Sequence, residues 1–129
     1  MTDDERAQYL RKVDFASIQN APEQRASQRL LDHTNGARTC MVSYIHTPGG
    51  SGSPEGMHTH EVDQIFYLLS GRMNLEIAGE VMTAEPGSLI VFPAGVPHRN
   101  WNAGNEPTVH LAINAPLPDP NKPLAQRAG

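Results

Sequence analysis

The chain has 129 residues, with 14 acidic and 10 basic side chains that give a formal net charge of −4. This length predicts one domain, and the acidic balance excludes the basic surface typical of a nucleic-acid binder. A charged N-terminus with no apolar segment after it excludes an ordinary secretory signal, and no apolar run approaches the roughly 20 residues of a membrane span. A single cysteine, Cys40, leaves no intrachain disulfide. We therefore expect a cytoplasmic protein without a nucleic-acid or membrane partner.

The first half of the chain predicts an arm, two strands and a loop. Residues 1–27 are polar with scattered apolar positions, so we expect an N-terminal arm with a single turn of helix that packs on the domain or on a partner. Residues 29–32 and 37–47 are predicted strands, because apolar side chains recur in them at strand spacing. Glycine and proline dominate residues 48–56, which are therefore a predicted loop.

The second half of the chain predicts a series of short strands joined by turns. Residues 64–70 are apolar on both faces, and residues 72–78 alternate between apolar and polar positions. Glycine and proline turns separate the further strands predicted at 81–84, 88–92, 96–102 and 108–115. The proline-rich residues 117–129 are an expected extended or disordered tail. So many short strands and so little helix predict an all-β sandwich or a barrel-like jelly roll.

Two groups of regularly spaced residues combine histidines with glycines, a proline and amides. They read Gly52-x5-His58-x-His60-x3-Gln64-x6-Gly71 and Gly87-x5-Pro93-x-Gly95-x2-His98-x3-Asn102. Neutral imidazoles are the commonest protein ligands for metal ions near neutral pH. Alternate residues of a strand lie on one face, so His58, His60 and Gln64 are predicted to point the same way.

These two groups match the two signature motifs of the cupin superfamily apart from one substitution, and the chain resembles that family from about Leu30 to Pro116. The resemblance implies a single-domain jelly-roll β-barrel at residues 28–116, between the N-terminal arm (1–27) and the C-terminal tail (117–129). It also implies one divalent metal ion inside the barrel of each subunit. Carried over residue by residue, the family's ligands fall on His58, His60, His98 and Gln64, the last at a position where the family has a carboxylate.

The amide of Gln64 changes the chemistry that we expect from such a site. A divalent ion held by three neutral imidazoles and an amide keeps its full formal charge, which makes it a stronger Lewis acid and lowers the pKa of bound water further. Dioxygen activation at iron usually employs two histidines and a carboxylate. The substitution therefore favours proton-transfer chemistry, in which metal-bound water is our first choice of catalytic group and no catalytic side chain is assigned. Zinc, nickel, manganese and iron all stay open as the metal.

The resemblance implies a small-molecule function for the barrel. Cupins of similar size with the same ligand set include uronate-linearising enzymes and polyketide cyclases. We therefore favour a metal-dependent, non-redox enzyme of the isomerase, cyclase or lyase type, acting on a polar carbonyl, sugar-acid or polyketide-like substrate. A metal-dependent dioxygenase of a small aromatic or enediol compound and a non-catalytic ligand-binding cupin stay as alternatives. The outward-facing stripe of Ile65, Tyr67 and Leu69 is apolar enough to predict a homodimer.

Two further histidines are expected to lie outside the site. His110 is expected to point outward, because Val109, Leu111 and Ile113 resemble the core face of the same strand. A pocket residue or a further ligand is the alternative for His110. His46 is predicted to end a strand beside the glycine-rich loop, so we expect a solvated side chain there.

Overall fold

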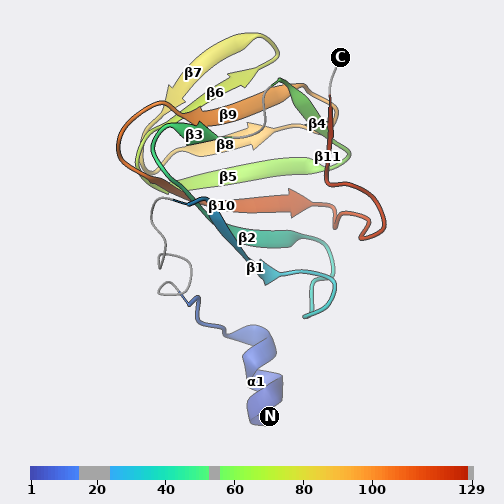
Figure 1. The fold of residues 1–129 in the computed structure, drawn as a ribbon. Coiled ribbons are helices and arrows are strands. Elements are labelled where there is room, and N and C mark those ends of the chain that lie inside the picture. The colour runs from blue at the N-terminus through green and yellow to red at the C-terminus, as the bar shows by residue number, and fades with distance from the viewer. Residues whose placement is uncertain (15–23, 53–55, 128–129) are drawn as a thin grey trace.

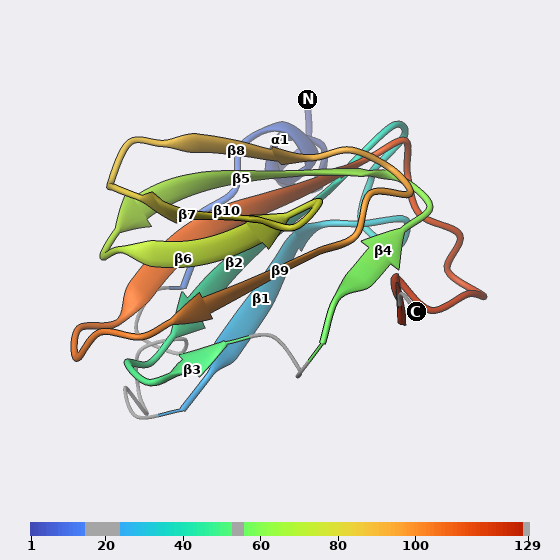
Figure 2. The same ribbon diagram turned by 90° about the horizontal axis from the view of Figure 1, so that it is seen from above.

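The strands of the computed structural model form two antiparallel sheets (Figures 1 and 2). The structure describes residues 1–14, 24–52 and 56–127. Parts of the expected arm, loop and tail lie outside these described residues, namely 15–23, 53–55 and 128–129. Buried apolar side chains from both sheets meet in one core cluster of Phe66, Leu68, Met73, Leu75, Ala84, Ile90, Phe92 and Ala112. The predicted all-β jelly-roll barrel is confirmed.

The two sheets contain strands that are far apart in the sequence. The first has five strands in the order β1 (Ala26–Leu31), β2 (Met41–Thr47), β10 (Thr108–Ala115), β5 (Asp63–Ser70) and β8 (Leu89–Phe92). The second has six strands, with the order β11 (Ala125–Arg127), β4 (His58–His60), β9 (His98–Asn102), β6 (Met73–Ile77) and β7 (Glu80–Ala84), while β3 (Ser51–Gly52) pairs with β9. Two predicted strand boundaries are corrected. Strand β1 begins at Ala26, within the expected arm, and β2 begins at Met41 and not at residue 37.

Tight turns and alternating side chains explain why these strands close around a core. Ala78 (φ 51°) and Gly79 (φ 88°) both have positive φ between β6 and β7, as a two-residue hairpin turn of matching twist requires. Gly71 has φ 80°, and a Cβ atom there would collide with the carbonyl oxygen of Pro107. The last glycine of the first motif is therefore needed where β5 turns beneath the start of β10.

The N-terminal arm begins with a short helix, α1 (Asp3–Tyr9), which is two turns long where one was expected and projects away from the sheets (Figure 1). The chain after it contacts the first sheet. Arg11 Nη1 donates a hydrogen bond to the carbonyl oxygen of Leu30 at 2.9 Å, and Val13 packs against the buried pair Tyr44 and Val109. Among the described ranges, no helix combines the length and apolar character needed to cross a membrane.

The expectation that His110 points outward is wrong. His110 is only 1% exposed, and it lies opposite Ile45 of β2 and Leu68 of β5, on the inner face of the first sheet. The apolar residues that suggested the opposite assignment, Val109 and Leu111, belong instead to the outer cluster that Val13 covers. The outer face of β10 is also apolar, so the sequence pattern alone assigned it to the core.

The expectation that His46 is solvated is also wrong. His46 is 3% exposed because it lies inside β2, with Ala26 of β1 on one side and Val109 of β10 on the other. Its Nδ1 lies 3.4 Å from the carbonyl oxygen of Gln24. His46 therefore belongs to the outer face of the first sheet and lies away from the barrel interior.

The expected C-terminal tail contains a strand. Strand β11 pairs antiparallel with β4, with Ala125 opposite His60 and Arg127 opposite His58. Figure 1 shows β11 beside β4, at the edge of the second sheet. The prolines of the tail lie before this strand, so they do not interrupt its backbone hydrogen bonds.

Candidate metal centre

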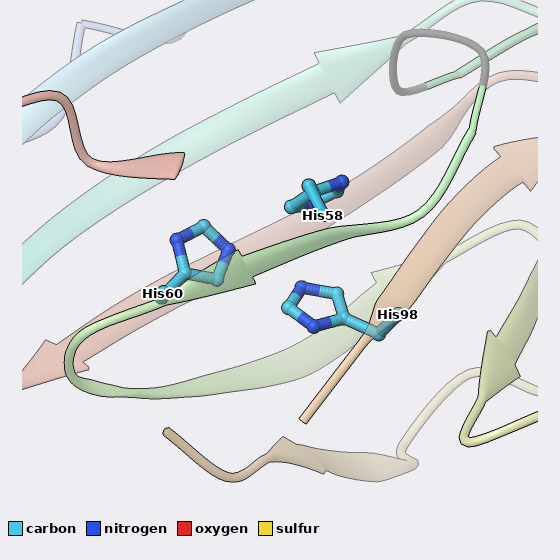
Figure 3. Close-up of side chains that lie close together, drawn as sticks. All are labelled: His58, His60 and His98. Carbon is cyan, nitrogen blue, oxygen red and sulfur yellow. The ribbon is translucent and has the colours of Figure 1, made fainter. Parts of the chain in front are cut away.

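Three of the predicted ligands, His58, His60 and His98, meet on the inner surface of the barrel (Figure 3). The first two come from β4, and His98, at the start of β9, pairs directly with His58. The ring centroids are 4.4 Å apart for His58 and His98, 4.9 Å for His60 and His98, and 5.1 Å for His58 and His60. One ring nitrogen from each can be chosen so that all three lie within 4.8 Å of one another.

A turn in the second motif brings His98 to this position. Pro93 and Gly95 shape the turn, in which Gly95 has φ 78°. The backbone N–H of Gly95 donates to the carbonyl oxygen of His60 at 2.9 Å, and the N–H of Ala94 donates to Asp63 Oδ1 at 2.8 Å. The turn before β9 is therefore attached directly to the strand that carries the other two histidines.

Hydrogen bonds to the backbone fix the tautomers of two of the histidines. His60 Nδ1 lies 2.9 Å from the carbonyl oxygen of Leu124, and His98 Nδ1 lies 3.1 Å from that of Val96. A carbonyl oxygen can only accept, so each Nδ1 carries the proton and each Nε2 keeps its lone pair.

The two Nε2 atoms fit a bound metal ion. Nε2 of His60 and Nε2 of His98 are buried and have no hydrogen-bond partner within the described part of the chain. A buried nitrogen lone pair without a partner is costly in a folded protein, whereas a coordinated cation would satisfy both. Ligating histidines commonly donate their other ring nitrogen to a carbonyl, as these two do. Together His58, His60 and His98 could hold one metal ion.

Burial favours the neutral forms of His58 and His98 by lowering the pKa of each, and the neutral imidazole is the state that coordinates metals. Burial lowers the pKa of His98 to about 4, outweighing the opposing effect of the hydrogen bond to Val96, and the charges of His58 and His60 lower it further. Burial also lowers the pKa of His58, with a smaller contribution from His60.

Gln64 lies on the same inner surface as the three histidines. It is 8% exposed, and its position in β5 is opposite Phe92 of β8, whose ring stacks on His98 with centroids 4.0 Å apart. Gln64 Nε2 donates to Asn114 Oδ1 at 3.2 Å. Because the amide nitrogen has no lone pair to offer, a ligand role would fall to Oε1. The assignment of Gln64 as fourth ligand stays a prediction.

Two interior residues that the sequence reasoning missed lie on β10. Asn114, 1% exposed, orients the amide of Gln64. His110 packs on Phe66 with ring centroids 4.2 Å apart, and burial, with the charge of Arg25 as a lesser cause, lowers its pKa to about 3. Both would have been assigned to the interior if the inner face of β10 had been identified correctly, because alternate residues share a face.

The last residue of the second motif has a structural role. Asn102 is 3% exposed. Its Nδ2 donates to the carbonyl oxygen of Glu106 at 2.7 Å, and its Oδ1 accepts from the N–H of Gly104 at 3.0 Å. These bonds shape the loop between β9 and β10, so Asn102 acts on the loop and not on the metal centre.

Comparisons with known proteins agree with this geometry. The cupin domain family model matches residues 43–114, more than half of the chain. No curated protein shows significant sequence similarity to this chain. Among solved structures, a cupin-like protein from Thermotoga maritima has a TM-score of 0.69 at 22% identity, over 81% of this chain and 76% of that one.

Two named proteins share the same fold. The polyketide cyclase RemF from Streptomyces resistomycificus has a TM-score of 0.66 at 23% identity, over 83% of this chain and 72% of that one. KdgF from Halomonas sp. has a TM-score of 0.61 at 22% identity, over 74% and 81% respectively. Identities this low establish the shared fold alone. With both motifs in place in this barrel and the family model matched over most of its strands, the chain belongs to the cupin family.

Proposed function

We propose that this protein is a metal-dependent enzyme that catalyses a non-redox reaction on an oxygen-rich small molecule. The observation that carries the proposal is the pair of buried Nε2 atoms on His60 and His98, which converge with His58 and lack any other partner among the described residues. Bound at this site, a divalent ion supplies Lewis acidity toward a carbonyl or enolate oxygen of the substrate. Zinc, nickel, manganese and iron are all compatible with imidazole ligands.

The side chains around the site would hold the metal ion and set the charge that the substrate meets. His60 and His98 are held by the backbone before any ion arrives, so little conformational entropy is lost on binding. The neutral amide of Gln64 adds no negative charge beside them. This favours stabilisation of an anionic enolate over access to higher metal oxidation states, and it supports the non-redox reaction over the dioxygenase alternative.

The shared fold supports a carbonyl-bearing substrate only as an analogy. RemF, a polyketide cyclase, is among the proteins with the same barrel. We propose sugar acids and polyketide-like diketones as the first substrate classes to test. A ligand-binding role without catalysis is the alternative that would follow if such compounds bind without reacting.

The test is proton exchange next to a carbonyl. The protein, loaded in turn with zinc, nickel, manganese or iron, would be incubated in D2O with uronic acids and with β-diketones, and deuterium uptake followed by NMR beside an oxygen electrode. We expect metal-dependent exchange or rearrangement without oxygen consumption. Oxygen uptake during turnover would support the dioxygenase instead. Binding without exchange for every compound would favour the non-catalytic alternative.

We also propose that the protein acts as a cytoplasmic homodimer. The outward-facing side chains of β5 and β8 support a covering partner, because Tyr67, Leu69, Leu89 and Val91 are 41%, 43%, 66% and 47% exposed. Adjacent exposed apolar side chains on a sheet edge favour association. A second copy of the chain is the partner that we expect.

A further inference from the structure

The C-terminal segment, residues 117–127, returns across the first motif and contacts the metal centre. Strand β11 covers the edge of β4, with Ala125 opposite His60. Just before that strand, the carbonyl oxygen of Leu124 accepts the hydrogen bond from His60 Nδ1 at 2.9 Å. Lys122 Nζ also lies 3.8 Å from Glu61 Oε2, the residue after β4. The contacts therefore gather on the three-residue strand β4 and its exit.

The two tautomer-fixing bonds of the centre come from different parts of the chain. His98 bonds to Val96, two residues before it, so the turn that carries His98 also orients it. His60 bonds to Leu124, 64 positions away in the sequence. The orientation of His60 thus depends on docking of the C-terminal segment, whereas the orientation of His98 does not.

Apart from the hydrogen bond that the carbonyl oxygen of His60 accepts from the Gly95 N–H, strand β4 has few other restraints. It is three residues long, and its register with β9 is a single pair, His58 with His98. On its other side, β11 contributes three paired positions, Ala125, Gln126 and Arg127. Without β11, a short strand carrying two of the three histidines would become an unpaired sheet edge, free to fray.

We propose that the C-terminal segment is a positioning element of the metal centre. It aligns β4 through backbone pairing and, through the Leu124 carbonyl, holds the proton of His60 on Nδ1 so that the lone pair of Nε2 is presented to the ion. This inference rests on the metal binding of the proposed function. Outer hydrogen-bond partners of ligating histidines typically change metal affinity by about 10- to 100-fold, and we expect a loss of that size when the segment is removed.

The test compares three proteins with the parent. One ends at Pro118 and lacks the bond to His60 together with β11. One is full-length with Ala125→Pro, which disrupts the pairing opposite His60 because proline has no N–H and restricts the residue before it. The matched control lacks only residues 128–129, which leaves β11 in place. Thermal unfolding of each protein checks that it is folded.

Two measurements distinguish positioning from general damage. Zinc affinity is measured by competition with a chromogenic chelator, and the ring tautomers of His60 and His98 are read from 15N chemical shifts of the metal-free proteins. We expect zinc to bind about 10- to 100-fold more weakly to the two altered proteins. His60 should lose its single Nδ1–H tautomer while His98 keeps it, and the control should match the parent in both respects.

Other outcomes would overturn the inference. Zinc affinity within twofold of the parent, or an unchanged His60 tautomer, would show that the segment does not position the ligand. Loss of both tautomers would show that the segment stabilises the whole centre without a specific action on His60. If the parent itself binds no zinc, nickel, manganese or iron, the proposed function fails, and the tautomer measurement still decides whether the segment orients His60.

Discussion

Two parts of the five-stranded sheet, the outer surface of β5 and β8 and the inner surface of β10, depart from the usual pattern of apolar inside and polar outside. On the outer surface of β5 and β8, Tyr67, Leu69, Leu89 and Val91 are apolar and 41–66% exposed. On the inner surface of β10, Thr108, His110 and Asn114 are polar and each 1% exposed. A barrel that encloses a polar site places polar side chains inside, so polarity alone does not reveal which face of a strand is buried.

The cover available to each surface accounts for the difference. The inner surface packs against the second sheet, because Phe66 and Phe92 share one core cluster with Met73 and Leu75 of β6. On the outer surface, Val13 covers the part around Tyr44 and Val109. The part formed by β5 and β8 has no such cover among the described residues, and for it we propose the second subunit. Four experiments test the roles assigned to these inner and outer surfaces.

The largest effect is expected from removing an inner ligand. His98→Ala should weaken zinc binding by more than the roughly 100-fold that loss of an outer hydrogen-bond partner costs, because one of three convergent imidazoles disappears. Chelator competition measures the affinity. The matched control is His33→Ala, which removes an exposed histidine in a turn. Equal zinc affinity in the two variants would mean that the inner cluster is not a metal centre.

The outer surface should respond to a charge in its most exposed apolar residue. Leu89→Glu should weaken the proposed homodimer by about 10- to 100-fold, because burying a leucine contributes about 1.5–3 kcal/mol and a buried carboxylate is unfavourable. Sedimentation velocity over a concentration series measures the change. The control Val81→Glu places the same charge at a 61% exposed valine of β7 in the other sheet. A parent that sediments as a monomer would contradict the proposed cover.

The amide at the inner surface gives a smaller predicted effect. Gln64→Glu should tighten zinc binding by about tenfold, because a carboxylate adds a negative charge beside the cation while losing the hydrogen bond from Nε2 to Asn114. Gln64→Leu, which removes the oxygen altogether, should weaken binding. If both variants bind zinc like the parent, Gln64 is not a ligand and the charge argument for non-redox chemistry loses its basis.

The smallest effect concerns the acid stability of the metal-free protein. Burial lowers the pKa of His110 to about 3, whereas an unfolded histidine titrates near 6.5. Between these two pKa values only the unfolded state binds the extra proton. The contribution of His110 to the free energy of unfolding is therefore fully present above about pH 6.5 and falls as the pH drops, by at most about 1.4 kcal/mol per pH unit. Urea unfolding at several pH values should show a shallower fall in His110→Phe. Identical slopes in parent and variant would show that His110 does not titrate in this way.

Much of this molecule follows from its sequence. The spacing of glycine and proline around short apolar runs predicted an all-β sandwich or barrel. The resemblance of the two motifs to the cupin family implied the jelly roll and the meeting of His58, His60 and His98. The common face of His58 and His60 depends on local geometry, because alternate residues share a strand face. The arrival of His98 beside them was implied only by the family resemblance. The shared face also explains why Gln64 was placed inside with the histidines.

The features that were missed depend on contacts between distant segments. The inner face of β10 could not be identified from the sequence, because Val109 and Leu111 belong to a second apolar cluster on the outer face of the sheet. Docking of the C-terminal segment was invisible for a different reason. The group that contacts His60 is the backbone carbonyl of Leu124, and every residue has such a carbonyl, so no residue type marks it.

The bond from Gly95 to the carbonyl oxygen of His60 has a consequence for how an ion enters and leaves. It links the two motifs directly, so folding of the chain brings the three imidazoles together before an ion binds. Binding energy then adds to folding stability, and a saturating metal should raise the unfolding temperature. Release of the ion should in turn require the turn and β4 to separate together. We therefore expect metal exchange to follow local opening of the barrel rim, at a rate that hydrogen exchange of the Gly95 amide would report.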